Sequence, residues 1–283
     1  MKATTYKALK VMLAALFGAC SIIAFISVLL IHYLLEQQKQ SALSLEQWKK
    51  KIANMRTIVI NLERRPDRKN FMMSQLKDTQ LKYEFFPAID GKLLNSSDCI
   101  NERLSFLSRI HPRTKFNFTE ACETLGPYFW QYGVIGCWQS HLQIYFDIVE
   151  RSKQTGMDEP VLIFEDDANV PSNLTQILPQ LMPQLPDDWD AFFLGRHYHV
   201  CSVNVTKDLC KLDFFFGTHA YILNGAKSAE KIISISNTEM IQFADVAWLS
   251  YTGGYLNFYT VSGDQIVKQD DEVRKVSDVL FYG

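Results

Sequence analysis

The longest apolar run of the chain lies at its N-terminus. From Val11 to Ile31 there is no Asp, Glu, Lys or Arg, and a helix needs about 20 such residues to cross a bilayer. A cleaved signal peptide is the alternative, but its apolar part is usually only about 7–15 residues long and is followed by a small-residue cleavage site. We therefore predict an uncleaved transmembrane signal-anchor helix over residues 11–35.

The flanks of this run predict its orientation. Three lysines precede it, whereas no Lys or Arg follows it until Lys39. Because Lys and Arg are enriched on the cytosolic side of a span, residues 1–10 are predicted to form a cytosolic tail and the chain after residue 35 to be lumenal. This predicts a single-pass type II protein of the Golgi or endoplasmic reticulum membrane, attached through its N-terminal helix.

After the anchor, the apolar positions predict a short stem and one large domain. Apolar residues between residues 36 and 56 recur at helical spacing, which predicts an amphipathic stem helix. From residue 57 to residue 283, apolar runs typical of buried strands alternate with helical stripes. The predicted strands cover 57–62, 82–86, 161–164, 190–195 and 220–223, and the predicted helices begin at Pro66, Gly136 and Ala226. Such alternation indicates a mainly parallel α/β sheet with crossover helices.

Composition agrees with a folded domain and excludes one class of partner. Apolar residues make up 47% of the chain and aromatic residues 13%, which is enough for a large core. The net charge of −2 gives no electrostatic basis for nucleic-acid binding. Four Asn-X-Ser/Thr sequons begin at Asn95, Asn117, Asn173 and Asn204, as expected of a glycoprotein in the lumen.

The cysteines fit the same compartment, since the lumen permits disulfides. Cys201 and Cys210 bracket a short polar loop and are the first candidates for a bridge, with Cys99 and Cys122 as the second. Cys137 then remains as a thiol on an apolar helix. No Cys or His spacing in the chain is typical of a zinc site.

Three consecutive acids follow an apolar strand. Glu165, Asp166 and Asp167 come directly after residues 161–164, and ligands of α/β sheets bind beyond the carboxyl ends of such strands. A hard divalent ion, Mn²⁺ or Mg²⁺, would neutralise these acids and bind substrate phosphates. An acidic surface turn at the end of a strand is the alternative interpretation.

Two further clusters are candidates for ligand binding. Asn61, Leu62, Arg65 and Arg68 follow the first strand and enter a helix N-terminus, which favours anions, while arginine adds bidentate donors for phosphate. A solvated first turn with local salt bridges is the alternative. His141 follows Gly136, Cys137 and Ser140 on an apolar helix, where it is either a cofactor-binding group or a hydrogen-bonded core histidine.

Taken in order, these motifs resemble glycosyltransferase family 25. The matching stretches are Ile60-Asn61-Leu62 with Arg65 and Arg68, Ala88–Gly91, Gly136-Cys137 with Ser140-His141, Leu162–Asp167, Gly217–Ile222, Ala244–Leu249, and Gln269 followed by Ser277–Val279. The family includes bacterial lipooligosaccharide galactosyltransferases and animal collagen galactosyltransferases. The resemblance spans roughly residues 57–280, which makes residues 57–283 the expected lumenal glycosyltransferase domain.

The resemblance implies a GT-A-like, Rossmann-type fold and an inverting transfer of a hexose from a UDP-sugar. Galactose is the expected sugar and glucose the second choice, with a glycan or protein hydroxyl as acceptor. By position, Asn61, Leu62, Arg65 and Arg68 would lie by the nucleotide, and Asp166 and Asp167 would hold the metal and the diphosphate.

An inverting transfer also needs a general base that takes the proton of the acceptor hydroxyl. Asp245 is our first candidate because its apolar neighbours favour a raised pKa, and Asp278 is the second. Asp245 is alternatively the N-cap of the segment that follows it. A different class of function also fits the sequence, namely a catalytically inactive relative that binds glycans or acts in adhesion.

Overall fold

The computed structural model describes residues 27, 28, 31, 44–90, 132–197, 199–238 and 255–270. The chain divides into two compact units, Met1–Gln47 and Trp48–Gly283. No helix in the described ranges has the length and apolar character needed to cross a membrane, and nearly all of the predicted anchor, residues 11–35, falls outside those ranges.

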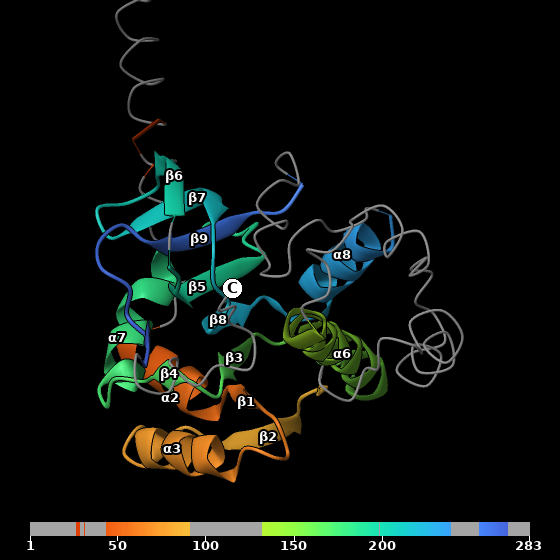
Figure 1. The fold of residues 1–283 in the computed structure, drawn as a ribbon. Helices are drawn as coiled ribbons and strands as arrows, with labels where there is room; N and C mark the ends of the chain where they lie inside the picture. Colours follow the sequence, from red (N-terminus) through yellow and green to blue (C-terminus); the bar gives the residue numbers. More distant parts are fainter. Residues whose placement is uncertain are drawn as a thin grey trace, which may run out of the picture. The chain divides into compact units, whose positions relative to one another are not determined.

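The second unit is built around one large mixed sheet (Figure 1). Its strands lie in the order β2-β1-β3-β8-β5-β9-β7-β6, and a separate pair joins β4 to β10. The strands are β1 (Arg56–Asn61), β2 (Tyr83–Pro87), β3 (Val161–Glu165), β4 (Ala168–Asn169), β5 (Ala191–Gly195), β6 (His199–Asn204), β7 (Leu209–Phe215), β8 (Ala220–Leu223), β9 (Phe258–Val261) and β10 (Lys268–Gln269).

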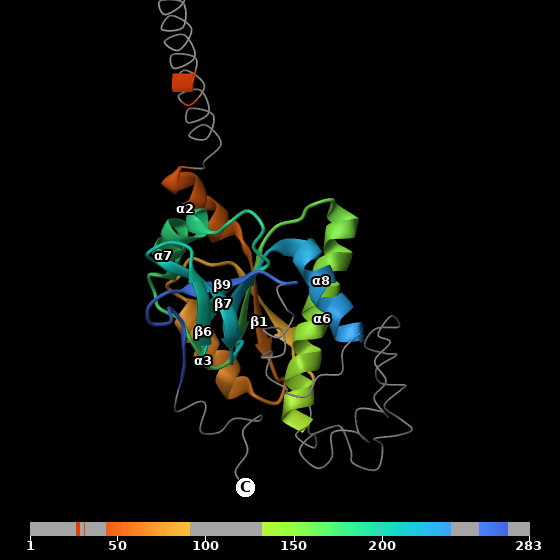
Figure 2. The same cartoon turned by 90° about the horizontal axis from the view of Figure 1, so that it is seen from above.

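Helices cover both faces of this sheet, as Figures 1 and 2 show. One face packs against α6 (Tyr132–Thr155) and α8 (Gly225–Thr238). The other packs against α2 (Leu45–Asn54), α3 (Pro66–Leu76) and α7 (Leu174–Leu181). A short 3₁₀ helix, η4 (Met182–Gln184), follows α7.

The two cores follow from the alternation of side chains along each strand. In β1, Ile58 and Ile60 belong to the core with α6 and α8, whereas Val59 belongs to the core with α2 and α3. Because both faces are covered, the central strands read as continuous apolar runs. The part of the predicted stem from Trp48 onward contributes to the second core, where Ile52 is fully buried.

The predicted mixture of strands and helices is confirmed, but the expectation of a mainly parallel sheet needs correction. In the described part of the chain, β1 is parallel to β2 and β3, and β5 is parallel to β9, whereas β8 runs antiparallel to both β3 and β5. The outer strands β6, β7 and β9 also pair antiparallel. The reason is that no helix separates β5 from β8, so this stretch lacks the crossover connections that parallel neighbours require.

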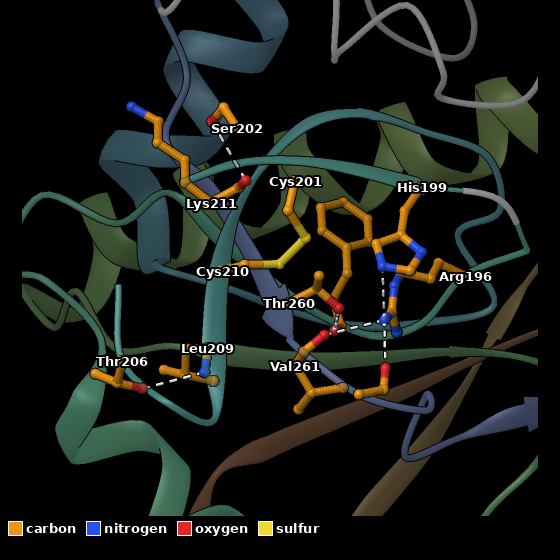
Figure 3. Close-up of a disulfide and its surroundings, with 12 residues drawn as sticks. Arg196, His199, Cys201, Ser202, Thr206, Leu209, Cys210, Lys211, Thr260 and Val261 are labelled. Atoms are coloured by element: carbon orange, nitrogen blue, oxygen red, sulfur yellow. Dashed lines mark hydrogen bonds between the residues drawn. A yellow bond between two sulfur atoms is a disulfide. The ribbon is translucent and has the colours of Figure 1, made fainter. Parts of the chain in front are cut away.

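The predicted Cys201–Cys210 disulfide is confirmed. It joins β6 to β7 across a hairpin, as Figure 3 shows, and the two Cα atoms are 5.8 Å apart. Cys137 is a thiol in the described structure, whereas Cys99 and Cys122 lie outside the described residues.

Candidate active site

The carboxyl ends of β1 and β3 bring the two predicted clusters together. These strands are parallel neighbours, so Asn61 at the end of β1 lies beside the turn that follows Glu165 in β3. The acids in this turn, Asp166 and Asp167, are 6% and 4% exposed. They are therefore buried carboxylates at the ligand-binding edge of the sheet, and the interpretation of an exposed acidic turn does not fit them.

Asp166 is held by one cation and one amide. Its Oδ1 accepts a hydrogen bond of 2.8 Å from Nη1 of Arg68, and its Oδ2 accepts one of 2.8 Å from Nδ2 of Asn61. Arg68 is itself buried and is on the first turns of α3. Burial raises the pKa of Asp166, and the charge of Arg68 opposes that rise. The three side chains thus form a buried polar cluster that ties α3 to the ends of both strands.

Asp167, the next residue of the turn, has different hydrogen-bond partners from Asp166. Nε2 of Gln269 donates a hydrogen bond of 2.7 Å to its Oδ2, and Nη1 of Arg68 lies 3.7 Å from the same oxygen. Its Oδ1 is buried and has no hydrogen-bond partner among the described residues. Burial, and then the charge of Glu165, raises the pKa of Asp167 to about 7. An unpartnered buried carboxylate oxygen is costly unless a proton or a cation binds it, so Asp167 fits a hard divalent ion.

Glu165 faces the other side of the sheet. Its Oε1 is 3.2 Å from Nε2 of His141 on α6 and accepts a hydrogen bond of 2.6 Å from Oγ1 of Thr218. Burial by itself raises the pKa of Glu165, but the hydrogen bond and charge of His141 outweigh it and bring the pKa to about 2. His141 is 1% exposed, and its Nδ1 is 2.8 Å from the hydroxyl of Tyr221. It is therefore a buried, hydrogen-bonded histidine whose ring reaches the acid motif.

The three consecutive acids thus point to separate partners. In the described ranges, only Cys137, His141 and Glu165 form a group of three or more His, Cys, Asp or Glu whose ligand atoms converge within 4.8 Å. Glu165, Asp166 and Asp167 do not form such a group. Asp167 has a buried oxygen without a hydrogen-bond partner among the described residues, whereas Arg68 and Asn61 bind both oxygens of Asp166.

The remaining predicted residues lie near the site or outside the described structure. The carbonyl of Leu62 accepts a hydrogen bond of 2.8 Å from the amide of Arg65, which forms the turn into α3. The side chain of Arg65 pairs with Asp67 at 2.6 Å, as expected of a solvated first turn. Both candidate bases, Asp245 and Asp278, lie outside the described residues.

Arg196 is a buried cation at this edge that the sequence analysis did not single out. It follows β5 directly, and its Nη2 donates to the carbonyls of Val261 and Gly263 at 3.0 and 2.8 Å. Figure 3 shows the contact between Arg196 and Val261. Burial lowers its pKa to about 10. Its Nε and Nη1 have no partner in the described part of the chain. The available signal was a single cation placed directly after an apolar strand.

Comparisons with known proteins identify the family of the chain. A family model described as glycosyltransferase family 25 (LPS biosynthesis protein) matches residues 54–247, which include Asn61, Arg68, His141 and Glu165–Asp167. The chain is 25% identical over 183 residues to procollagen galactosyltransferase 2 of Homo sapiens, covering 62% of this chain and 26% of that protein. It is 28% identical over 167 residues to a putative glycosyltransferase of Acanthamoeba polyphaga mimivirus, covering 59% and 45%.

Some relatives carry names that describe lost activity. The chain is 31% identical over 150 residues to inactive glycosyltransferase 25 family member 3 of Homo sapiens, covering 52% of this chain and 22% of that protein. In each of these alignments the chain spans less than half of the relative's length. The family match covers more than half of the chain, and the chain therefore belongs to glycosyltransferase family 25.

Proposed function

We propose that the chain is a UDP-sugar-dependent hexosyltransferase that uses a divalent ion, Mn²⁺ or Mg²⁺, at the carboxyl end of β3. The transferred hexose is galactose, with glucose as the second candidate, and the acceptor is a hydroxyl of a glycan or protein. The transfer inverts the anomeric centre. Membership of the family supports the reaction class, and the name of the procollagen galactosyltransferase relative supports galactose.

The unpartnered Oδ1 of Asp167 is the observation that carries this proposal. It is a buried carboxylate oxygen beside the cationic Arg68 and at the sheet edge where nucleotide ligands bind. A divalent ion bound there would neutralise negative charge on the diphosphate leaving group. Gln269 holds the other oxygen of Asp167 and so orients the carboxylate.

The neighbouring residues position this carboxylate and complete the charge balance. Arg68 and Asn61 bind both oxygens of Asp166, which fixes the turn that carries Asp167. In this proposal the amides at the start of α3 and the guanidinium of Arg65 contribute to binding the nucleotide diphosphate. Asp245 is proposed as the general base and Asp278 as the alternative.

The setting of this reaction is part of the same proposal. We place the enzyme in the Golgi or endoplasmic reticulum as a single-pass type II membrane protein, with residues 57–283 in the lumen. The apolar run from Val11 to Ile31 supports the anchor. The disulfide between Cys201 and Cys210 supports an oxidising compartment.

A second candidate function is a glycan-binding protein without transferase activity. One observation favours it. Arg68 and Asn61 donate hydrogen bonds to both carboxylate oxygens of Asp166, so this acid has no free oxygen for a metal. The relatives named as inactive support the same alternative.

Release of UDP by the full-length chain tests the first candidate against the second. UDP-galactose and UDP-glucose are each incubated with Mn²⁺ and a panel of glycan and peptide acceptors. Asp167→Asn is expected to lose at least about a hundredfold in turnover, since it removes the charge that binds the cation. The matched control is Asp213→Asn, which changes an exposed acid of β7 and leaves turnover unchanged.

The outcomes separate the two functions. Binding of UDP without release from either sugar on any acceptor would favour the glycan-binding protein. Turnover that is equal in Asp167→Asn and in the unaltered chain would contradict the role of this carboxylate.

A further inference from the structure

Three side chains with different donor atoms meet between α6 and the end of β3. Cys137 and His141 are four residues apart on α6, so their side chains lie on the same face of the helix. Glu165 approaches that face from β3. The Sγ of Cys137, a ring nitrogen of His141 and a carboxylate oxygen of Glu165 all lie within 4.8 Å of one another.

These separations suit a common metal ligand sphere. With metal–nitrogen and metal–oxygen bonds of about 2.0 Å and a metal–sulfur bond of about 2.3 Å, the edges of a tetrahedron measure roughly 3.3–3.5 Å. The distance of 3.2 Å between Nε2 of His141 and Oε1 of Glu165 already matches such an edge. The sulfur lies at most 4.8 Å from the other two ligand atoms, which is within about 1.5 Å of the length of such an edge.

Two tyrosine hydroxyls on the Nδ1 side of the His141 ring favour metal binding at Nε2. Its Nδ1 is 2.8 Å from the hydroxyl of Tyr221, which is 2.9 Å from the hydroxyl of Tyr145. When Nε2 binds a metal, Nδ1 carries the proton and donates it to Tyr221, which donates in turn to Tyr145. Metal-binding histidines usually have such a partner on their second nitrogen, because it fixes the tautomer and the ring orientation.

The donor set also selects the class of ion. A thiolate, an imidazole and a carboxylate are the ligands of Zn²⁺ and related transition metals, whereas Mg²⁺ prefers oxygen ligands alone. Cys137 is partly exposed, so an ion can reach the site. The buried Oδ1 of Asp167 is not one of these ligands.

We propose that Cys137, His141 and Glu165 bind a thiophilic transition-metal ion, with Zn²⁺ as the physiological candidate. Three protein ligands leave one coordination position for water or another ligand. The bound ion links α6 to the acid-bearing end of β3 and holds the carboxylate of Glu165 in place. This inference does not depend on the sugar-transfer reaction.

Co²⁺ serves as the probe in the full-length chain, because a cobalt–thiolate bond gives a charge-transfer absorption that oxygen and nitrogen ligands do not give. The metal-free protein, with its Cys201–Cys210 bridge kept oxidised, is expected to develop this absorption with Co²⁺ and to lose it when Zn²⁺ displaces the probe. Cys137→Ser is expected to abolish the absorption and to weaken Zn²⁺ binding at least tenfold. Asp167→Asn is the matched comparison and retains the absorption.

A second measurement needs no variant. Zn²⁺ is expected to slow alkylation of Cys137 in the unaltered chain, followed by peptide mass mapping, and to raise the melting temperature by about 5–10 °C at a hundredfold excess over its Kd. Cobalt binding without thiolate absorption, absorption that persists in Cys137→Ser, or a disulfide found at Cys137 would each overturn the proposal. Loss of UDP release in Asp167→Asn would test the proposed transferase and would leave the proposed metal site of Cys137, His141 and Glu165 unaffected.

Discussion

Replacement of Arg68 by methionine tests how the acid cluster is held together. Arg68 and Asp166 are 6% and 8% exposed in their side chains, and their charged atoms are 2.8 Å apart. Methionine keeps most of the apolar stem and removes the charge. Asp166 then remains buried beside Asp167 without its cation, and removing one partner of a buried pair costs about 3–5 kcal/mol.

This cost is large for a domain of this size. Each 1 kcal/mol shifts the melting temperature of a domain of 150–250 residues by about 2–4 °C, so Arg68→Met is expected to lower it by roughly 6–20 °C. Thermal unfolding followed by circular dichroism measures the shift, and urea unfolding gives the free energy. Arg151→Met is the control, because Arg151 is an exposed residue of α6 and such changes stay within about 0.5 kcal/mol.

A double variant separates loss of the charge pair from general damage. Arg68→Met combined with Asp166→Leu removes both charges, and apolar replacement of a whole buried pair is often close to neutral. The double variant is therefore expected to recover most of the stability that Arg68→Met loses. A single variant as stable as Arg151→Met, or a double variant less stable than the single one, would refute the assignment of Arg68 as the counter-ion of Asp166.

Three further changes test other parts of the structure. Reduction of the Cys201–Cys210 bridge, or its replacement by two alanines, is expected to cost about 2–3 kcal/mol of unfolding free energy because the closed loop is short; an unchanged urea midpoint would contradict this. Gly225→Ala is expected to cost more than about 1 kcal/mol, because φ is +71° and the added Cβ would clash with the carboxylate of Asp158; a wild-type melting temperature would disprove it. Asp67→Asn is expected to cost less than about 1 kcal/mol near neutral pH. The hydrogen bond from Arg65 lowers the pKa of Asp67 in the folded protein to about 2. The stabilisation that Asp67 gives the folded state is therefore present above its unfolded-state pKa and is lost as pH falls from about 4 to 2. A stability difference between the unaltered chain and Asp67→Asn that grows as pH falls over this range would contradict this explanation.

The central part of the fold could be predicted because its strands are buried on both faces. Residues 57–60 and 161–164 are almost fully buried, so they appear as unbroken apolar runs. The hairpin of β6 and β7 was not predicted, because β6 is mostly exposed and lacks that signal. The short strands β4 and β10 depend on pairing between segments far apart in the chain, which local patterns do not reveal.

The site was predictable in its composition and only partly in its contacts. Asn61 and the acids after Phe164 could be placed together because both follow strands and parallel strands end at one edge. The choice of Arg68 over Arg65 as partner of Asp166 depends on the rotation of α3, and the contact of His141 with Glu165 depends on the packing of α6. These are properties of tertiary packing rather than of local sequence.

The hairpin at the end of the sheet also affects how copies of this protein behave in concentrated solution. In the described part of the chain, β6 is the last strand of the sheet, and such a strand offers unpaired amides and carbonyls to other chains. Its register with β7 shifts around Cys201, and the bridge to Cys210 keeps that irregular geometry in place. A regular ladder of backbone hydrogen bonds with a second molecule is therefore disfavoured, which protects the protein against edge-to-edge aggregation.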